Sequence, residues 1–260
     1  MATATRKFIQ ARNYTRGRDS SIDVLVIHTM ENQEKPDGAE NIATWFAGST
    51  APKASAHYCI DSNSVVQCVR DEDVAWHAPG ANHDGLGFEH AGTAKQTGRD
   101  WTDEYSRSML EHSAKLVAEK CVQYKIPPVW LTPADLQAGR RGITSHNNVS
   151  KAFNQSTHWD PGVGFNIERY LKRVRELMGS VDAQVFKQDP PLVRRGDSGW
   201  RVKQIQKRLK LHGFGTGSID GDYGPNTEKQ VRAFQKAQDI DVDGVVGPMT
   251  WKMLNKAPQG

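Results

Sequence analysis

Two histidines and an aspartate supply the donor set of a metal centre. His28 ends the apolar run IDVLVIH, and His146 and Asp160 stand fourteen residues apart in ITSHNNVSKAFNQSTHWDPGVGF. Two imidazoles and one carboxylate match the protein ligands of a catalytic zinc, which keeps one coordination position open. Because water bound at such a position ionises near neutral pH and attacks amides, a hydrolase is the leading hypothesis. Each residue alone is a weak signal, since a histidine that ends a buried strand more often makes core hydrogen bonds.

Alternating strand and helix patterns must position these three residues. The run 22–27 is continuous and β-branched, as in a strand buried on both faces. Further strands are predicted in AHYCIDSNSVVQCVR around the polar turn 61–64, in LGFEH and in RRGITSH. Helices are predicted over 39–47, over 103–124 and in FNIERYLKRVREL; in the first, Ile42, Trp45 and Phe46 share one side. This alternation predicts an α/β fold, a sheet covered by helices.

The hairpin pattern also places two of the three cysteines symmetrically. Cys59 and Cys68 flank the turn in CIDSNSVVQC and could face each other across the hairpin. We favour the interpretation that they are two small apolar strand residues, because thiols stay reduced in the cytosol.

A second pattern begins after residue 180. Residues 181–191 have no periodic apolar face, carry Pro190-Pro191 and predict a linker. Beyond it lie three short helical patterns, and the turns IDGDYGPNT and VDGVVGPMT share the repeat D-G-x-x-G-P-x-T. We therefore predict a catalytic domain over 1–180, a linker over 181–191 and a small all-α three-helix domain over 192–260.

The positive charge is concentrated in this C-terminal part. Residues 187–260 hold 13 Lys and Arg against 8 Asp and Glu, whereas residues 1–186 hold 21 against 22. A basic module favours a polyanionic partner such as nucleic acid or an anionic cell wall, and a solvated face is an equal alternative. The sequence contains no apolar run of about 18 residues, so membrane insertion is not expected. The N-terminus lacks the apolar core of a signal peptide, which favours synthesis in the cytoplasm.

Five ordered motifs closely resemble the zinc-dependent N-acetylmuramoyl-L-alanine amidases. They are IDVLVIHTM, SAHYCID, EDVAWHAPGANHDGLGFEH, GITSHNNVS and HWDPGVGF, and they cover roughly residues 20–175. The family includes phage lysozyme-amidases and is similar to the peptidoglycan recognition proteins. The resemblance implies a mixed sheet with helices on both sides and cleavage of the amide between N-acetylmuramic acid and L-alanine. It makes His28, His146 and Asp160 the zinc ligands.

The same resemblance implies roles for further residues. Glu89, in GFEH, matches an acidic residue of the family and is expected to act as general base and then acid. His158 stands where many members have lysine; an imidazole N–H can still stabilise an oxyanion. His57 lies where some members place a Tyr or His facing the metal, which makes it a third catalytic candidate. Two histidines are expected either to border the substrate groove or to order its loop: His77 and His83. Three others are expected to be structural: His90, His112 and His212.

The C-terminal segment resembles the three-helix peptidoglycan-binding domain found beside many wall hydrolases. The matching motifs are GDSGWRVKQIQKRL, IDGDYGPNTEKQVRAFQ and DGVVGPMTW. The resemblance makes Asp220, Tyr223 and Thr227 candidates for substrate binding, and turn formation and helix capping are their alternative roles.

We therefore expect a modular amidase that resembles a phage endolysin, with Zn²⁺ as cofactor and bacterial peptidoglycan as partner. It is expected to be a monomer, to be made in the host cytoplasm without a signal peptide and to act on the wall after release. One alternative is a bacterial autolysin of the same activity. Another is a non-catalytic peptidoglycan receptor, although such relatives typically lose a zinc ligand. A nucleic-acid-binding protein is disfavoured, because no stacking platform or groove-reading motif is present.

Overall fold

The computed structural model describes residues 5–215 except 180–191, and residues 217–256. The predicted linker, 181–191, lies outside the described residues. The chain forms two compact units, the larger built from most residues up to 179 and the smaller mainly from residue 192 onward. The elements follow in the order β1 (Thr5–Phe8), β2 (Tyr14–Thr15), β3 (Val24–Thr29), α1 (Gly38–Ala47), β4 (Tyr58–Ile60), β5 (Ser64–Gln67), β6 (Val74–Ala75), β7 (Gly85–His90), η1 (Asp100–Thr102), α2 (Glu104–Tyr124), α3 (Pro133–Gln137), β8 (Gly142–Ser145), α4 (His146–Phe153), α5 (Ile167–Met178), α6 (Trp200–Leu211), α7 (Pro225–Ala237) and α8 (Pro248–Leu254).

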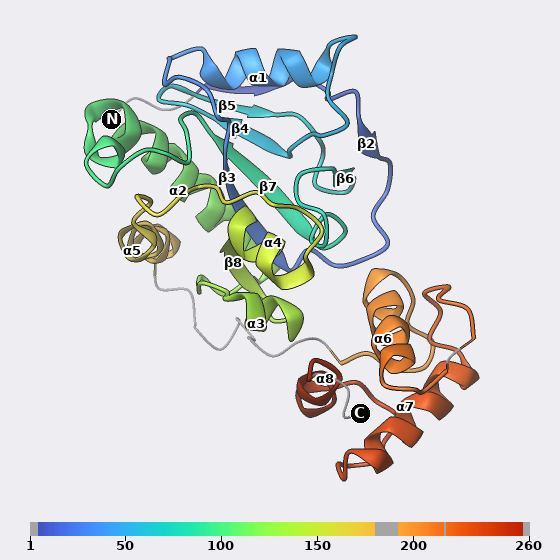
Figure 1. The fold of residues 1–260 in the computed structure, drawn as a ribbon. Coiled ribbons are helices and arrows are strands. Elements are labelled where there is room, and N and C mark those ends of the chain that lie inside the picture. The colour runs from blue at the N-terminus through green and yellow to red at the C-terminus, as the bar shows by residue number, and fades with distance from the viewer. Residues whose placement is uncertain (1–4, 180–191, 216, 257–260) are drawn as a thin grey trace. The chain divides into compact units, whose positions relative to one another are not determined.

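The larger unit is built on a six-stranded mixed sheet with the strand order β1-β5-β4-β7-β3-β8 (Figure 1). Strand β3 pairs in parallel with both β7 and β8, and β4 pairs in parallel with β7. Strands β4 and β5 form the antiparallel hairpin that the sequence predicted. A mixed central sheet flanked by helices is thus confirmed. The strands β3, β7 and β8 run in one direction, so their carboxyl ends meet at one edge of the sheet.

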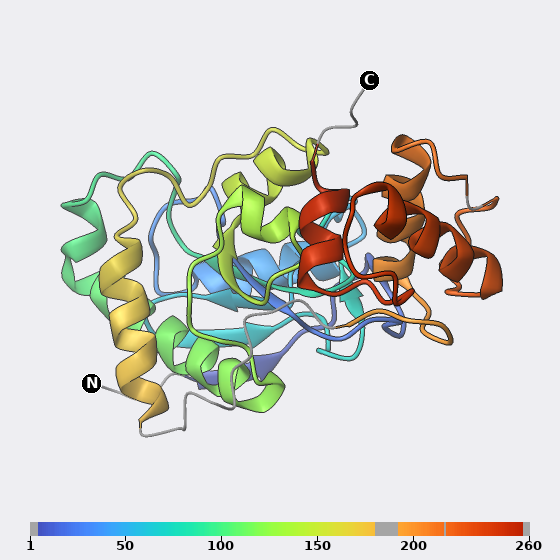
Figure 2. The same ribbon diagram turned by 90° about the horizontal axis from the view of Figure 1, so that it is seen from below.

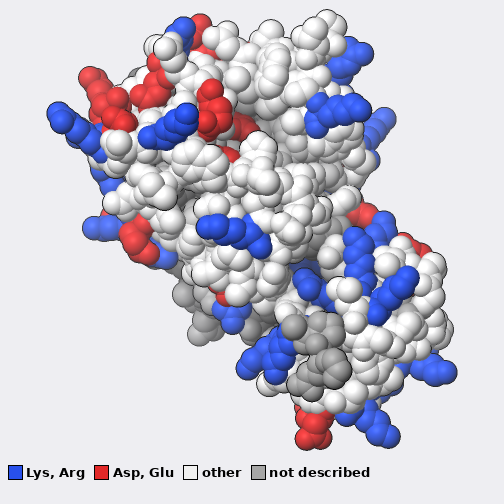
Figure 3. Space-filling model, in the orientation of Figure 1, with Lys and Arg blue, Asp and Glu red and all other residues white. Residues whose placement is uncertain are grey.

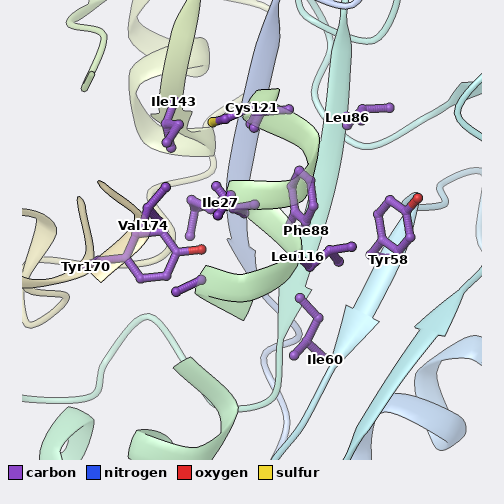
Figure 4. Packing of buried hydrophobic residues seen from close by; sticks show 14 of the residues in the cluster. Ile27, Tyr58, Ile60, Leu86, Phe88, Leu116, Cys121, Ile143, Tyr170 and Val174 are labelled. Carbon is purple, nitrogen blue, oxygen red and sulfur yellow. The ribbon is translucent and has the colours of Figure 1, made fainter. Parts of the chain in front are cut away.

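One face of the sheet packs against α2 and α5. Apolar residues of the strands, including Ile27 and Phe88, meet Leu116 of α2 and Val174 of α5 in the largest hydrophobic core (Figure 4). Helix α2 begins where the Asp103 side chain accepts a hydrogen bond from a backbone N–H, as an N-cap does. The apolar side chains recur along α2 at helical spacing and face this core, which explains why the sequence marked it so clearly.

The opposite face is covered by α1 and α4. Helix α1 buries Ala39, Ala43 and Phe46 against the hairpin, whereas Trp45 is 48% exposed. The prediction that Trp45 shares the buried side was wrong, because the closely packed face is made by the two alanines. Helix α4 packs with α3 beside β3 in a separate core. Figure 2, seen from below, shows that helices lie on both sides of the strands.

The two hairpin cysteines do face each other, as free thiols. The Sγ atoms of Cys59 and Cys68 lie 3.7 Å apart, and both side chains are fully buried. Burial raises the pKa of Cys59 well above its usual value, so this thiol is an apolar core group rather than a nucleophile.

The smaller unit is a three-helix domain of α6, α7 and α8 around an apolar core. Its two repeated turns are built alike, each around a buried glutamine. Gln206 donates to Asp220, the Asp222 carbonyl oxygen and Thr227, and accepts from the backbone N–H of Gly221. The second copy has the equivalent residues Gln235, Asp243, Val245, Thr250 and Gly244. On the face drawn in Figure 3, Lys and Arg predominate over Asp and Glu in this unit.

None of the helices in the described part of the chain is long and apolar enough to cross a membrane.

Candidate metal centre

The three predicted ligands converge at the carboxyl ends of the parallel strands. His28 lies near the end of β3, and His146 is the first residue of α4, directly after β8. His146 opens a helix because the Ser145 side chain caps that helix by accepting from the backbone N–H of Asn148. Asp160 reaches the same place from the loop before α5, and its carboxylate accepts from the backbone N–H of Thr29. Open α/β sheets bind ligands at this edge.

The spacing of the donor atoms fits a small tetrahedral metal ion. Nδ1 of His28 lies 3.1 Å from Nδ1 of His146 and 3.2 Å from Oδ2 of Asp160. Nδ1 of His146 lies 3.2 Å from Oδ1 of the same carboxylate. Bonds of about 2.1 Å to a tetrahedral zinc separate ligand atoms by about 3.4 Å, close to these three spacings, in which each histidine faces a different oxygen of the Asp160 carboxylate. Of the His, Cys, Asp and Glu side chains described, only these three form such a metal-binding group.

The protonation of this cluster also suits a metal. Burial lowers the pKa of His28 to about 4, so the ring is neutral and keeps a lone pair near neutral pH. Burial alone would raise the pKa of Asp160, but hydrogen bonds with His146 and His28 hold it below its usual value. Neutral imidazoles and an ionised carboxylate are the ligand forms that metal binding requires.

Glu89 is placed beside this cluster by the register of the sheet. It is the partner of His28 in the parallel pairing of β3 and β7, so both side chains point to the same face. Its Oε2 atom is buried and has no hydrogen-bond partner among the described residues. Burial, followed by the negative charges of Asp160 and Glu31, raises the pKa of Glu89 well above its usual value. A carboxyl group with a raised pKa can exchange protons near neutral pH.

His158 lies at the open side of the cluster. Its ring stacks on that of His146, with centroids 4.4 Å apart and an interplanar angle of 6°. Its Nδ1 is 3.8 Å from Asp160, yet 64% of its side chain is exposed. It is therefore the histidine of the site that solvent or a substrate can reach, as an oxyanion donor must be.

His57 is close to the site but committed to other bonds. Its Nδ1 accepts from the backbone N–H of Gly87, and its Nε2 lies 3.3 Å from the Asp73 carbonyl oxygen and 3.1 Å from Arg18. Burial, with the charge of Arg18, lowers its pKa to about 3. Both ring nitrogens are thus in use, and the ring has no free position for proton transfer. These contacts favour a structural role for His57 over the catalytic role that was expected.

His77 and His83, the two candidates for the border of the substrate groove, lie in different places. His77 is buried, and its Nδ1 lies 3.1 Å from Nε2 of His28, so it touches a predicted ligand instead of open solvent. His83 is exposed in the loop before β7, at the opposite end of that strand from Glu89. Of the two expected roles, ordering of the loop fits these positions better than contact with substrate, because the His77 ring is inside and His83 is at the other end of the strand.

The three candidates in the smaller unit are used for internal structure. Tyr223 is 1% exposed and donates to the Gly244 carbonyl oxygen. Thr227 is also buried and bonded to Gln206, while Asp220 accepts from Gln206, Ser218 and the backbone of Asp222. These bonds explain the repeat as two turn-and-cap structures, and they contradict a ligand-binding role for the Tyr223 and Thr227 side chains.

Some supporting residues were not predicted. Ser156 lies 3.3 Å from Nε2 of His146 and is itself bonded to Ser150. Half-buried Arg18 donates to five backbone carbonyl groups between Asp71 and Gly85 and so orders the segment that carries His77. A lone serine and a lone arginine carry no signal in one sequence, because only the folded contacts give them these roles.

The chain is similar to known wall amidases. The family profile described as N-acetylmuramoyl-L-alanine amidase matches residues 18–163, more than half of the chain. The chain belongs to the N-acetylmuramoyl-L-alanine amidase family. A second profile, of a peptidoglycan-binding domain, matches residues 198–254 of this amidase.

Individual relatives of the amidase agree with the family match. A protein of Bacillus licheniformis described as "Probable N-acetylmuramoyl-L-alanine amidase" is 31% identical over 99% of this chain and 74% of its own length. The amidase CwlL of the same species is 25% identical over 98% of this chain and 72% of its own length. The crystal structure of the hydrolase AmiA of Staphylococcus aureus shares the fold, with a TM-score of 0.54 and 15% identity over 68% of this chain and 85% of that one.

The enzyme is therefore an N-acetylmuramoyl-L-alanine amidase that carries a peptidoglycan-binding domain, and bacterial peptidoglycan is its partner. It hydrolyses the amide that joins N-acetylmuramic acid to the L-alanine of the stem peptide.

Proposed function

We propose that this amidase is a zinc enzyme whose ion is held by His28, His146 and Asp160. The observation that carries the proposal is the convergence of the two Nδ1 atoms and the Asp160 carboxylate: the Nδ1 atoms are 3.1 Å apart, and each lies 3.2 Å from one of the two carboxylate oxygens. When bound, zinc supplies Lewis-acid activation of the attacking water and of the scissile carbonyl group.

Two residues of the chain then transfer the proton and stabilise the negative charge that develops in the reaction. Glu89 takes a proton from the attacking water and returns it to the departing L-alanine nitrogen; its Oε2 is suited to this because it is buried and has no hydrogen-bond partner in the described part of the chain. His158 donates an N–H to the carbonyl oxygen as negative charge develops on it. The products are a free carboxylate on the lactyl group of the muramic acid and a free amine on the stem peptide.

We assign residues 1–180 to the catalytic domain, 181–191 to a linker and 192–260 to a wall-binding domain. The basic composition of the last part supports attachment to an anionic wall, which raises the local concentration of the catalytic domain. The proposed biological role is that of a phage endolysin, a monomer made in the host cytoplasm that acts on the wall after release. An autolysin of the same activity is the alternative role, and it would lyse cells without help from a membrane pore.

Digestion of purified peptidoglycan tests the proposal. After removal of metal by a chelator, the amidase should release no stem peptides, and added Zn²⁺ should restore release. Mass analysis should then find new L-alanine amino termini and intact glycan strands. Full activity in the chelated protein would contradict the zinc proposal, and new reducing sugar ends would contradict the amide as the bond that is cleaved.

A further inference from the structure

Nε2 of His28, the ring nitrogen that faces away from the proposed metal, has another histidine as its partner. Nδ1 of His28 faces His146 and Asp160, while Nε2 lies 3.1 Å from Nδ1 of His77. The two rings are perpendicular, with centroids 5.2 Å apart, so one edge of His28 meets the edge of His77. Metal-binding histidines usually direct their free nitrogen at a carboxylate, a carbonyl group or water. Here a second buried imidazole occupies that position.

Strand β7 is shaped to make room for this imidazole. A Cβ atom on Gly87 would lie 2.6 Å from Cγ and 2.8 Å from Nδ1 of His77, and one on Gly85 would lie 3.3 Å from the same ring. Any side chain at position 87 would therefore displace the ring. The backbone N–H groups of His77 and Ala78 both donate to the Asn82 side chain, which holds the segment in place from the other side.

The His77 ring is only partly satisfied by hydrogen bonds. Its Nε2 is buried and has no partner within the described part of the chain. A buried polar atom without a partner costs about 1–3 kcal/mol. By contrast, His57 and His90, which are also buried, have a partner at each ring nitrogen. An apolar residue at position 77 would avoid the free-energy cost of this buried polar atom. The contact of His77 with His28 is therefore better explained by function than by stability.

We infer that His77 is a positioning residue for the metal ligand His28. A neutral imidazole that offers its Nδ1 lone pair to a cation must carry its proton on Nε2, and that N–H points at Nδ1 of His77. His77 accepts this bond, which fixes both the tautomer and the rotation of the His28 ring. The inference rests on the proposed zinc site, and it assigns His77 no contact with the substrate.

Zinc affinity, measured by competition with a coloured chelator, tests this role without any use of activity. His77→Leu removes the acceptor and keeps an apolar side chain of similar bulk, and it should weaken zinc binding about 10- to 100-fold. His77→Asn places an amide oxygen near the position of Nδ1 and should recover most of the affinity. Circular dichroism and thermal melting establish that both variants are folded.

Two glycine variants make the same test without changing His77. Gly87→Ala should displace the ring and weaken zinc binding, whereas Gly98→Ala, where a Cβ atom meets only ordinary contacts, should leave it unchanged. Nitrogen NMR of the zinc-loaded wild-type protein should find the His28–His77 proton on Nε2 of His28 and His77 unprotonated at Nδ1. That spectrum decides the question even where a variant does not fold.

Unchanged zinc affinity in folded His77→Leu, or a proton on Nδ1 of His77 in the zinc-loaded protein, would overturn the inference. A wild-type protein that binds no zinc would instead refute the proposed metal site itself, so the two failures are distinguishable.

Discussion

At the scale of single residues, the number of hydrogen bonds that each side chain makes decides what it can do in the site. His57 has a partner at both ring nitrogens and is fixed, whereas Glu89 has a buried oxygen with no partner among the described residues. The raised pKa of Glu89, caused by burial and by the nearby carboxylates Asp160 and Glu31, leaves it able to exchange protons. Two groups that family resemblance marked as catalytic thus differ in what they can do.

Replacement of Glu89 by glutamine tests the proton-transfer role. The amide keeps the shape of the side chain but cannot accept the proton of the attacking water, so turnover should fall about 10²- to 10⁴-fold. Zinc content and melting temperature should remain those of the wild type. Near-normal release of stem peptides by Glu89→Gln would place the general base elsewhere.

Single residues were predictable where the residue type carries the chemistry. The two histidines and the aspartate were found because few side chains can bind zinc, and the structure brings them together. His77 was expected near the site, but its contact with His28 was not predicted. That contact depends on glycines at positions 85 and 87 of a neighbouring strand. Ser156 could not be found at all.

At the scale of elements, the parallel register of β3, β7 and β8 brings distant residues to one edge. Periodicity predicted these strands and α2, because apolar side chains repeat along them. It did not predict the short pieces β1, β2, β6, α3 and α4, whose few residues form no readable period. These pieces are held by tertiary contacts, such as the parallel pairing of β1 with β5.

The attachment of α2 to the hairpin includes a buried ion pair, which makes stability depend on pH. Asp71 lies 2.6 Å from Lys120 of α2 and accepts from Tyr58 and Tyr124. Burial acts to raise the pKa of Asp71, but the bonds from Lys120 and the two tyrosines hold it below its usual value. A carboxyl pKa that is lower in the folded state stabilises the fold above the unfolded pKa of about 3.9, and this contribution is lost as the pH falls through the folded value.

Asp71→Asn should therefore lower the free energy of unfolding by about 3–5 kcal/mol at pH 7, because it leaves Lys120 partly buried without its counter-ion. The difference from the wild type should begin to shrink as the pH falls below about 4 and should disappear as the pH falls through the lowered folded pKa of Asp71, where the wild type also loses the charge. Thermal or urea denaturation across pH 3–7 measures this. A difference that stays constant down to pH 3 would show that the charge of Asp71 does not contribute.

The two glutamine-centred turns of the smaller unit give a second prediction about elements. Gln206→Leu removes the bonds to Thr227 and to the backbone of Gly221 and Asp222, so it should destabilise this unit by about 2 kcal/mol or more. Gln204→Leu, on the same helix, is the matched control, since its side chain makes no hydrogen bond within the described residues. Equal melting temperatures for the two variants would show that the hydrogen bonds of Gln206 do not stabilise this unit.

At the scale of the whole molecule, catalysis and attachment to the wall are assigned to different parts of the chain. Every proposed zinc ligand and catalytic residue lies before residue 161, and the positive excess lies after residue 186. Residues 1–180 alone should cleave soluble muropeptides at a rate similar to that of the full chain but clear whole walls less well. Added salt should narrow this gap, because it screens the charges of the lost domain.

Sedimentation with purified peptidoglycan provides the complementary measurement. The segment 192–260 should sediment with the walls at low salt, and its failure to do so would mean that the basic domain is not a wall anchor. Equal wall clearance by the full chain and by residues 1–180 would lead to the same conclusion.

Zinc stoichiometry tests the central claim most directly. Elemental analysis of the purified amidase should find one zinc per chain, retained in Glu89→Gln and lost, together with activity, in His28→Ala and His146→Ala. This division is expected because His28 and His146 contribute donor atoms 3.1–3.2 Å from one another and from the Asp160 carboxylate, whereas Glu89 contributes none. Full stoichiometric zinc in His28→Ala would contradict it.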